Sequence, residues 1–365
     1  IDPDEGSLSN GFTLPRDSVL RAVLGRDSQT SCEYRSAQAV TLWPLKVSQA
    51  KYFGNPATVL GRLAANEPHA KAGLRLTLET GAELPFNSLG LDNLPLYLNG
   101  ADELPFRLYE QLLGNACAVF ARQPGSDWLE RLPDDALQSR GFDDCEAAMP
   151  VVAQAFQGYR LLQEYFALPQ RYLFVDFTGL SRAVQRCSGQ TLELIVLFAR
   201  FDQSLEGSVG PQQFVPFCTP AINLFARRVD RIHLSDRVTE HHVIADRTRP
   251  MDFEIHSLTG MTGHGTGPDQ GFLPFYAVRD PSRYGRDKAY YTVRREPRVL
   301  SSEQRRVGTR STYVGSETFV SLVDSQQAPY RHDLRQLGVC ALCTNRDLPL
   351  FMSTGSGKTD FTLAD

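Results

Sequence analysis

The sequence predicts an α+β fold that is rich in strands, with mixed or antiparallel sheets and a few helices. Two observations predict this class. Near-continuous apolar runs such as 191–201 are typical of strands that are buried on both faces, and helical spacing of apolar residues is confined to short segments. The chain has 365 residues, of which 42% are hydrophobic and 10% aromatic, so it can bury a substantial core, and two domains are expected.

The first part of the chain is expected to combine strands with one helix. Residues 1–31 are polar, with one short turn expected near Val19. Three stretches in which apolar residues alternate are expected to form strands: 39–47, 73–80 and 94–98. A helix is expected over 102–121, because Asp102 can cap it and leucines recur at helical spacing, before Pro124 breaks the pattern.

The segment 158–180 predicts a helix that leads directly into a core strand. The helix is expected over 151–167 and ends before Pro169, since proline disfavours helical geometry in the preceding residue. Residues 172–177 are apolar on both faces except Asp176, whose carboxylate we expect to accept hydrogen bonds from nearby backbone. The predicted core-facing side of the helix consists of apolar residues at helical spacing: Val152, Ala155, Phe156, Tyr159, Leu162 and Phe166.

The remainder of the chain predicts mostly strands. They are expected at 191–201, 231–234, 243–246, 252–258, 318–323 and 337–345. A glycine-rich loop is expected at 260–271, and 280–311 is arginine-rich without clear periodicity.

Charge and loop signals together predict a domain boundary. Residues 1–150 carry 13 basic and 20 acidic groups, whereas the remainder carries 25 and 22. We therefore expect an N-terminal α+β domain at 1–145 and a β-rich domain at 146–365 that begins with the helix 151–167. Because the chain begins at Ile1 and ends directly after an alternating stretch, we also expect it to be part of a longer polypeptide.

Composition disfavours several classes of function. The net charge of −4 argues against bulk binding of nucleic acid, and no apolar run reaches the roughly 18 residues that a membrane span needs. The seven cysteines are widely spaced and odd in number, which is not the pattern of a disulfide-stabilised secreted domain. Reduced, mostly buried thiols in a cytosol are the expected state.

Motifs that suggest chemistry fail on their spacing or context. Residues 352–359 resemble a phosphate-binding loop, but Met352 replaces its first glycine and a strand pattern follows where a helix is needed. Cys340 and Cys343 lie three apart in a strand pattern, so their sulfurs are expected on opposite faces. A histidine cluster is the candidate metal site: His233, His241 and His242 with Asp246. The glycine-rich residues Gly263–Gly267 are the candidate oxyanion-hole loop. We expect surface or subunit-contact histidines, a connecting loop, no catalytic site, no metal and no cofactor.

The arginine-rich stretch is the predicted contact surface. Arginine with tyrosine is typical of protein interfaces and also of loops that bind RNA. The overall acidic charge favours a protein partner, with a solvated loop or a nucleic-acid-binding module as alternatives. The candidate interface residues are Arg294, Arg295, Arg298, Arg305, Arg306, Arg310 and Tyr313.

Several blocks in the same order resemble the TssF family, baseplate subunits of the bacterial type VI secretion system. Besides 158–180, the matching blocks are 33–36, 91–100, 108–112, 218–225, 245–255, 311–317 and 341–349. The resemblance implies a structural, non-catalytic protein that is similar to the wedge proteins of contractile phage tails. A nucleotide-binding enzyme that uses 352–359 is the alternative from another class.

The resemblance also implies a set of partners and a location. Two TssF copies join one TssG, and this wedge binds TssE and TssK around the VgrG hub. The baseplate would lie in the cytoplasm of a Gram-negative bacterium, against the inner membrane, and nucleate assembly of the tail tube and sheath. No nucleic acid and no direct insertion into the membrane are implied.

Overall fold

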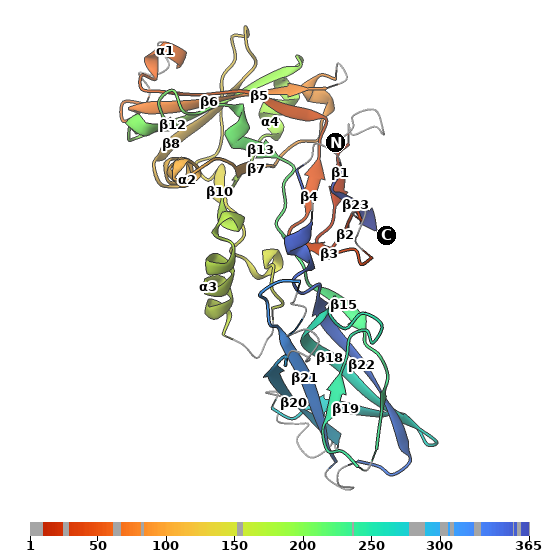
Figure 1. Ribbon diagram of the computed structural model, residues 1–365. Coiled ribbons are helices and arrows are strands. Elements are labelled where there is room, and N and C mark those ends of the chain that lie inside the picture. Colours follow the sequence, from red (N-terminus) through yellow and green to blue (C-terminus); the bar gives the residue numbers. More distant parts are fainter. Residues whose placement is uncertain are drawn as a thin grey trace. The chain divides into compact units, whose positions relative to one another are not determined.

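The computed structural model confirms a strand-rich fold with mixed and antiparallel sheets and a few helices (Figure 1). The structure describes residues 10–24, 29–60, 67–81, 84–151, 156–235, 237–276, 289–299, 306, 310–324, 330–352, 354–355 and 359–364. The α-helices in this part are α1 (Ala57–Leu60), α2 (Leu104–Gly114), α3 (Gln157–Ala167) and α4 (Ser181–Arg186). None of them is long and apolar enough to cross a bilayer.

The chain divides into two compact units. Unit 1 comprises residues 1–17 and 36–220, and unit 2 comprises 18–35 and 221–365. Residue 145 lies inside unit 1, so the predicted division at 145/146 does not coincide with this grouping. The polar segment near the N-terminus supplies strands to unit 2, a long-range pairing that local patterns do not reveal.

Unit 1 is built on a five-stranded antiparallel sheet of order β5-β6-β12-β8-β9. Its strands are β5 (Leu45–Phe53), β6 (Ala72–Thr80), β12 (Thr191–Phe198), β8 (Ala116–Arg122) and β9 (Glu130–Arg131). β12 is central and seven of its eight residues are buried, as its continuous apolar run predicted. The strand predicted at 73–80 is therefore confirmed, and the strand predicted at 191–201 is confirmed as far as Phe198.

A second sheet in unit 1 has the order β10-β11-β7-β13. Its strands are β10 (Leu137–Ser139), β11 (Phe174–Phe177), β7 (Leu94–Leu98) and β13 (Phe214–Pro216), and a separate pair joins β1 (Phe12–Leu14) to β4 (Val40–Leu42). One hydrophobic cluster unites residues of both larger sheets with α4. Figure 1 shows α3 projecting from the β10 end of the unit rather than lying across the five-stranded sheet.

Unit 2 contains a larger sheet of order β15-β22-β18-β19-β20-β21-β17, with β16 also paired to β22. Its strands are β15 (Phe225–Arg228), β16 (Ile232–His233), β17 (His241–Val243), β18 (Glu254–Gly265), β19 (Gln270–Pro274), β20 (Ala289–Pro297), β21 (Ser316–Asp324) and β22 (Leu334–Thr344). β19 and β20 run parallel and the other recorded pairs run antiparallel, so the sheet is mixed. Its buried side chains form a separate core.

A four-stranded sheet completes unit 2 and joins distant parts of the sequence. It consists of β14 (Ala221–Ile222), β3 (Glu33–Ser36), β2 (Val19–Ala22) and β23 (Phe361–Ala364) in that order. The turn expected near Val19 is wrong, because Val19–Ala22 pairs on one side with β3 and on the other with β23.

Three further predictions need correction. The helix expected over 102–121 ends at Gly114, and Ala116–Arg122 becomes β8, since it pairs with β12 and buries apolar residues there. The loop expected from 260 is the second half of β18, which extends to Gly265 along β22. The arginine-rich stretch includes β20, whose alternation is obscured because its outer half is exposed on both faces.

Candidate subunit interface

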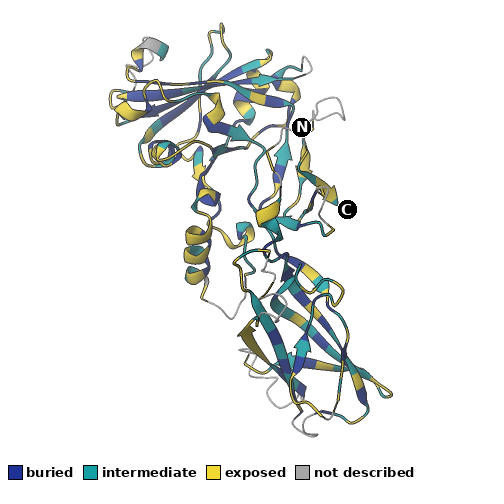
Figure 2. Ribbon diagram, viewed as in Figure 1, coloured by how far each residue is buried: buried dark blue, intermediate teal, exposed yellow. Residues whose placement is uncertain are grey.

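Helix α3 has its apolar face in solvent. Phe156, Tyr159 and Phe166 are 73%, 66% and 80% exposed, and Leu162 and Tyr165 are about half exposed on the same helix. Figure 2 shows this exposure as yellow along most of the helix. The prediction that these residues face the core is therefore wrong for all those that the structure describes; Val152 and Ala155 lie outside the described residues.

The side of α3 that faces the protein carries charges instead. The side chains of Arg160 and Glu164 are 6% and 2% exposed, and the side chain of Arg171, just beyond the helix, is 2% exposed. Glu164 Oε2 accepts a hydrogen bond from Arg160 at 3.2 Å and another from Arg171. The hydroxyl of Tyr172 donates to the same oxygen at 3.3 Å, and the backbone N–H of Met149 donates to Oε1 at 2.8 Å.

The two arginines use their remaining donors on neighbouring loops. Arg160 pairs with Asp144 at 2.7 Å. Arg171 donates to the carbonyl oxygens of Gly141 at 3.2 Å and Glu146 at 2.8 Å. Buried charges are tolerated only when paired and hydrogen-bonded, and this cluster meets that condition for Glu164. The cluster therefore holds α3 against the 141–149 segment in one rotation.

The ion cluster continues to the acid singled out in the sequence. Asp176 Oδ2 accepts hydrogen bonds from Arg140 and from Asn93, each at 3.3 Å, and Arg140 also pairs with Glu146 at 3.0 Å. The expected backbone partners of Asp176 are thus replaced by side chains, because β10 and β7 flank it and their backbone groups pair within the sheet. Asp176 is thus linked to Glu146 through Arg140.

The exposed face of α3 is suited to binding a protein. Within Gln157–Ala167 the only charged residues are Arg160 and Glu164, and both are buried. Three rings of roughly 200 Å² each, mostly exposed, give an apolar patch of roughly 400 Å², a size that marks interaction sites. A helix that binds at a membrane surface carries Lys or Arg on its polar face, so the composition of α3 favours a protein partner. We call Phe156, Tyr159, Leu162, Tyr165 and Phe166 the aromatic surface.

The sequence contained one signal that the charged face of α3 is buried and its apolar face exposed. Arg160 and Glu164 are the sole charges of the helix and lie four residues apart, the spacing at which side chains meet on one helix face. Such a pair is usually solvent-exposed, so the pattern alone favoured the apolar face as the buried one. The additional partners, Arg171 and Asp144, come from outside the helix.

The predicted arginine surface in unit 2 is largely engaged within the unit. Arg294 pairs with Glu240 at 2.5 Å, and Arg298 pairs with Glu317 at 3.4 Å. Arg295 donates to the carbonyl oxygen of His256. Arg306 is exposed, and Arg305 lies outside the described residues.

Arg310 and Tyr313 support the loops around β22. Arg310 forks onto Asp347 at 2.5 Å and Asp252 at 2.9 Å, and its bonds to both hold its own pKa above the ordinary value. The Tyr313 hydroxyl donates to Glu254 at 2.7 Å. Burial and this hydrogen bond raise the pKa of Tyr313 to about 12. These contacts position loops, and the use of the arginine stretch as an interface stays a prediction.

The remaining motifs resolve into structural features. The phosphate-loop candidate is followed by strand β23, as its alternation predicted, where nucleotide binding needs a helix; Lys358 lies outside the described residues. Cys340 is exposed and Cys343 is buried, which confirms that they occupy opposite faces of β22. Across the described residues, no group of three or more His, Cys, Asp or Glu side chains could hold a metal ion.

The histidine pair is more buried than expected. His241 is buried, and His242 stacks on Phe319 with ring centroids 4.8 Å apart. Burial lowers the pKa of both imidazoles, so the neutral form is favoured. They serve the packing of β17 on β21, and the expectation of surface histidines is wrong for His241.

Comparison with known proteins matches the whole chain to one family. The family model for the type VI secretion system protein TssF matches residues 1–365. The type VI secretion system component TssF1 of Pseudomonas aeruginosa is 71% identical over 364 residues, which cover 100% of this chain and 59% of that protein. The chain thus spans less than two thirds of the length of this curated relative.

Two solved structures share the fold. A type VI secretion TssK-TssF-TssG baseplate subcomplex contains a chain that matches with a TM-score of 0.69 at 22% identity, over 92% of this chain and 57% of that one. A type VI secretion baseplate complex matches with a TM-score of 0.50 at 19% identity, over 98% and 56%. At these identities the likeness shows the fold alone. The family model and the curated relative confirm the resemblance found in the sequence: the chain belongs to the TssF family of type VI secretion system proteins.

Proposed function

We propose that the chain is the structural part of a type VI secretion baseplate subunit and joins a TssG-type protein through the aromatic surface of α3. The observation that carries this is the reversed polarity of the helix, with charges buried beneath it and rings in water. A protein that works alone gains nothing from keeping such rings exposed, whereas a permanent assembly covers them with a partner's apolar surface.

The family and its solved relatives support the choice of partners. One solved structure that shares the fold is a complex of TssK, TssF and TssG. The wider set expected from the resemblance adds TssE, the VgrG hub and a second TssF copy, with assembly in the cytoplasm against the inner membrane. The protein acts through its interfaces and not through catalysis, and it requires no cofactor.

The alternatives draw less support from the described residues. A nucleotide enzyme needs a helix after 352–359, and a strand follows. A nucleic-acid module needs arginines free to contact phosphates, but Arg294, Arg298 and Arg310 already pair with carboxylates of their own unit.

Co-purification tests the proposal. The full-length protein is co-expressed with the TssG and TssK of the same organism and captured by a tag, as wild type and as Tyr159→Glu/Phe166→Glu. Both rings are exposed, so the substitutions leave the fold intact while placing charge on the surface. Loss of a buried aromatic anchor weakens binding by about 30-fold or more, so the variant should lose TssG.

Phe106→Glu, a half-exposed ring on α2, is the control and should retain it. Retention of TssG by the double variant, with an unchanged melting temperature in all forms, would contradict the assignment of the surface. Failure of wild type to capture either protein would contradict the baseplate role itself.

A further inference from the structure

Strand β5 ends the five-stranded sheet of unit 1, and its outer side is open. β5 pairs with β6 through eight aligned residues, and no described strand pairs with its other side. Along that side the described backbone makes no hydrogen bond to the 206–216 segment, which borders it. An open strand edge offers a row of unpaired N–H and C=O groups on which another strand can form.

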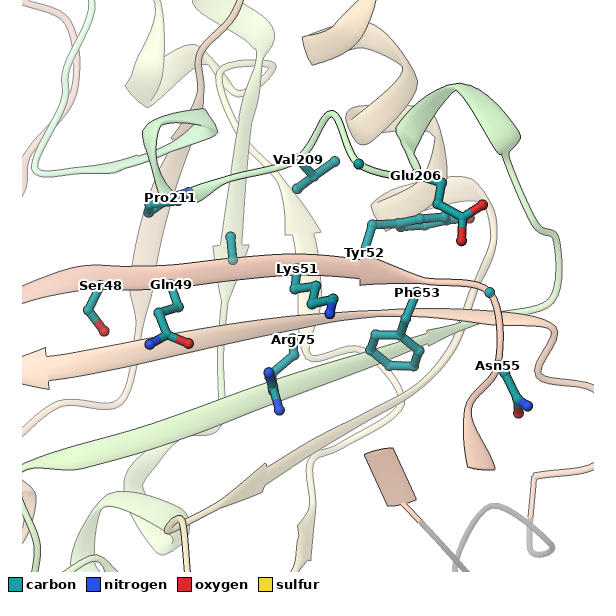
Figure 3. A pocket seen from close by; sticks show the side chains of 13 residues that line it. Ser48, Gln49, Lys51, Tyr52, Phe53, Asn55, Arg75, Glu206, Val209 and Pro211 are labelled. Atoms are coloured by element: carbon teal, nitrogen blue, oxygen red, sulfur yellow. The ribbon is translucent and has the colours of Figure 1, made fainter. Parts of the chain in front are cut away.

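A hollow of about 830 Å³ follows this edge. Figure 3 shows Lys51, Arg75 and Phe53 on one side of the strand, and Tyr52, Val209 and Pro211 on the other. Successive side chains of a strand point to opposite faces. The hollow therefore spans both faces at the strand edge, which is the position that an added strand would take.

The two sides of the hollow differ in chemistry. On one side Lys51 lies opposite Arg75 in register, and Arg75 and Arg122 share a single carboxylate, Glu193, at 3.8 and 2.6 Å. This side has an excess of positive charge. The other side is mainly apolar, with Tyr52 and Val209 packed into the core cluster and Glu206 at its end.

We propose that the β5 edge binds an extended segment of a partner protein in which acidic and apolar residues alternate. Such a segment would add an antiparallel or parallel strand beside β5, with its acidic side chains toward Lys51 and Arg75 and its apolar ones toward Val209 and Pro211, beside the buried Tyr52. This surface lies on different elements from α3, and the inference does not depend on the proposed function.

Charge also disfavours a second copy of this edge as the occupant. Lys51 is exposed on β5, and like charges across a strand pair are destabilising, whereas Lys46 pairs with Glu79 at 3.5 Å. Lys51 favours an acidic strand. The bulge between Val47 and Gln49 confines regular pairing to the Gln49–Phe53 half of the strand, where the hollow lies.

A charge exchange between peptide and protein tests the inference. The probe is a fluorescein-labelled nine-residue peptide in which valine and glutamate alternate, and the counter-probe has lysine in place of glutamate. Fluorescence anisotropy with the full-length protein should show tighter binding of the glutamate probe. Lys51→Glu should weaken that probe about fivefold, the scale of one exposed ion pair, and should strengthen the lysine probe. Lys71→Glu makes the same charge change at a residue that does not line the hollow and should alter neither.

Hydrogen exchange provides a readout specific to strand addition. Binding of the glutamate probe should slow exchange of amides within Leu45–Phe53, since a new strand takes up the open backbone groups. The proposal is overturned if neither probe binds, if Lys51→Glu leaves the preference unchanged, or if protection appears only elsewhere. These outcomes are separate from the TssG capture experiment, which leaves β5 unaltered.

Discussion

Removing the carboxylate of Glu164 should destabilise unit 1 strongly. Glu164→Ala would leave Arg160 and Arg171 buried, with side chains 6% and 2% exposed, and without the carboxylate that they share. Breaking a buried ion pair by removing one partner costs about 3–5 kcal/mol, because the other charge remains desolvated. For a unit of this size each kcal/mol lowers the melting temperature by about 2–4 °C. The expected fall is therefore roughly 6–20 °C.

Glu103→Ala is the matched control. Glu103 pairs with Arg107 at 3.1 Å, also across one helical turn, but its side chain is 79% exposed. An exposed pair of this type contributes little to stability because water screens it, so the melting temperature should stay close to that of wild type. Thermal unfolding followed by circular dichroism measures both variants. Equal shifts for Glu103→Ala and Glu164→Ala would refute the reasoning.

Two further predictions concern groups in unit 2. Cys340 should react quickly with a maleimide in the native protein and Cys343 should not, because Cys340 is exposed whereas burial raises the pKa of Cys343 to about 11. Mass mapping of the modified peptides measures the labelling of each thiol. Equal labelling would contradict the assigned faces of β22. Tyr313, with its pKa raised to about 12, should remain protonated in the folded state above the ordinary value of 10.0, as absorbance titration of wild type against Tyr313→Phe can measure. The raised pKa favours the protonated phenol in the folded state, so the contribution of Tyr313 to stability is complete below pH 10 and declines as the pH rises toward 12. Ionisation of Tyr313 near pH 10 in the native protein would refute this prediction.

The sequence predicted elements well where the local pattern and the tertiary environment agree. β12 is central in its sheet and reads as a continuous apolar run, so its position was evident. β8 was assigned to the preceding helix because Ala116–Ala121 has no strong strand pattern of its own, and its pairing with β12 decides its conformation. β2 escaped notice because both of its neighbours pair with it only in the folded chain, and one of them, β23, lies at the far end of the sequence.

The same distinction between local pattern and tertiary contacts applies to the candidate sites. Spacing alone placed Cys340 and Cys343 on opposite faces of a strand and placed a strand after the phosphate-like loop. The arginine stretch was read from composition, which does not reveal that Glu240, Glu317 and Asp347 lie within reach of its guanidinium groups. Contacts between charges distant in sequence decide whether an arginine supports the fold or is free to bind.

The charges beneath α3 decide which face of the helix points outward. Burying one large ring stabilises a protein by about 1.5–3 kcal/mol, so rotating the rings inward would by itself be favourable. That rotation would also separate Glu164 from Arg171 and Met149, which lie outside the helix. Part of the cluster would then stay buried without its partners, at a cost of about 3–5 kcal/mol. This cost offsets the gain from burying one or two rings, whereas covering the whole aromatic surface would gain more, and a partner protein can cover it without disturbing the cluster. A surface fixed in this way loses little conformational entropy when a partner covers it, which strengthens binding without any new contact.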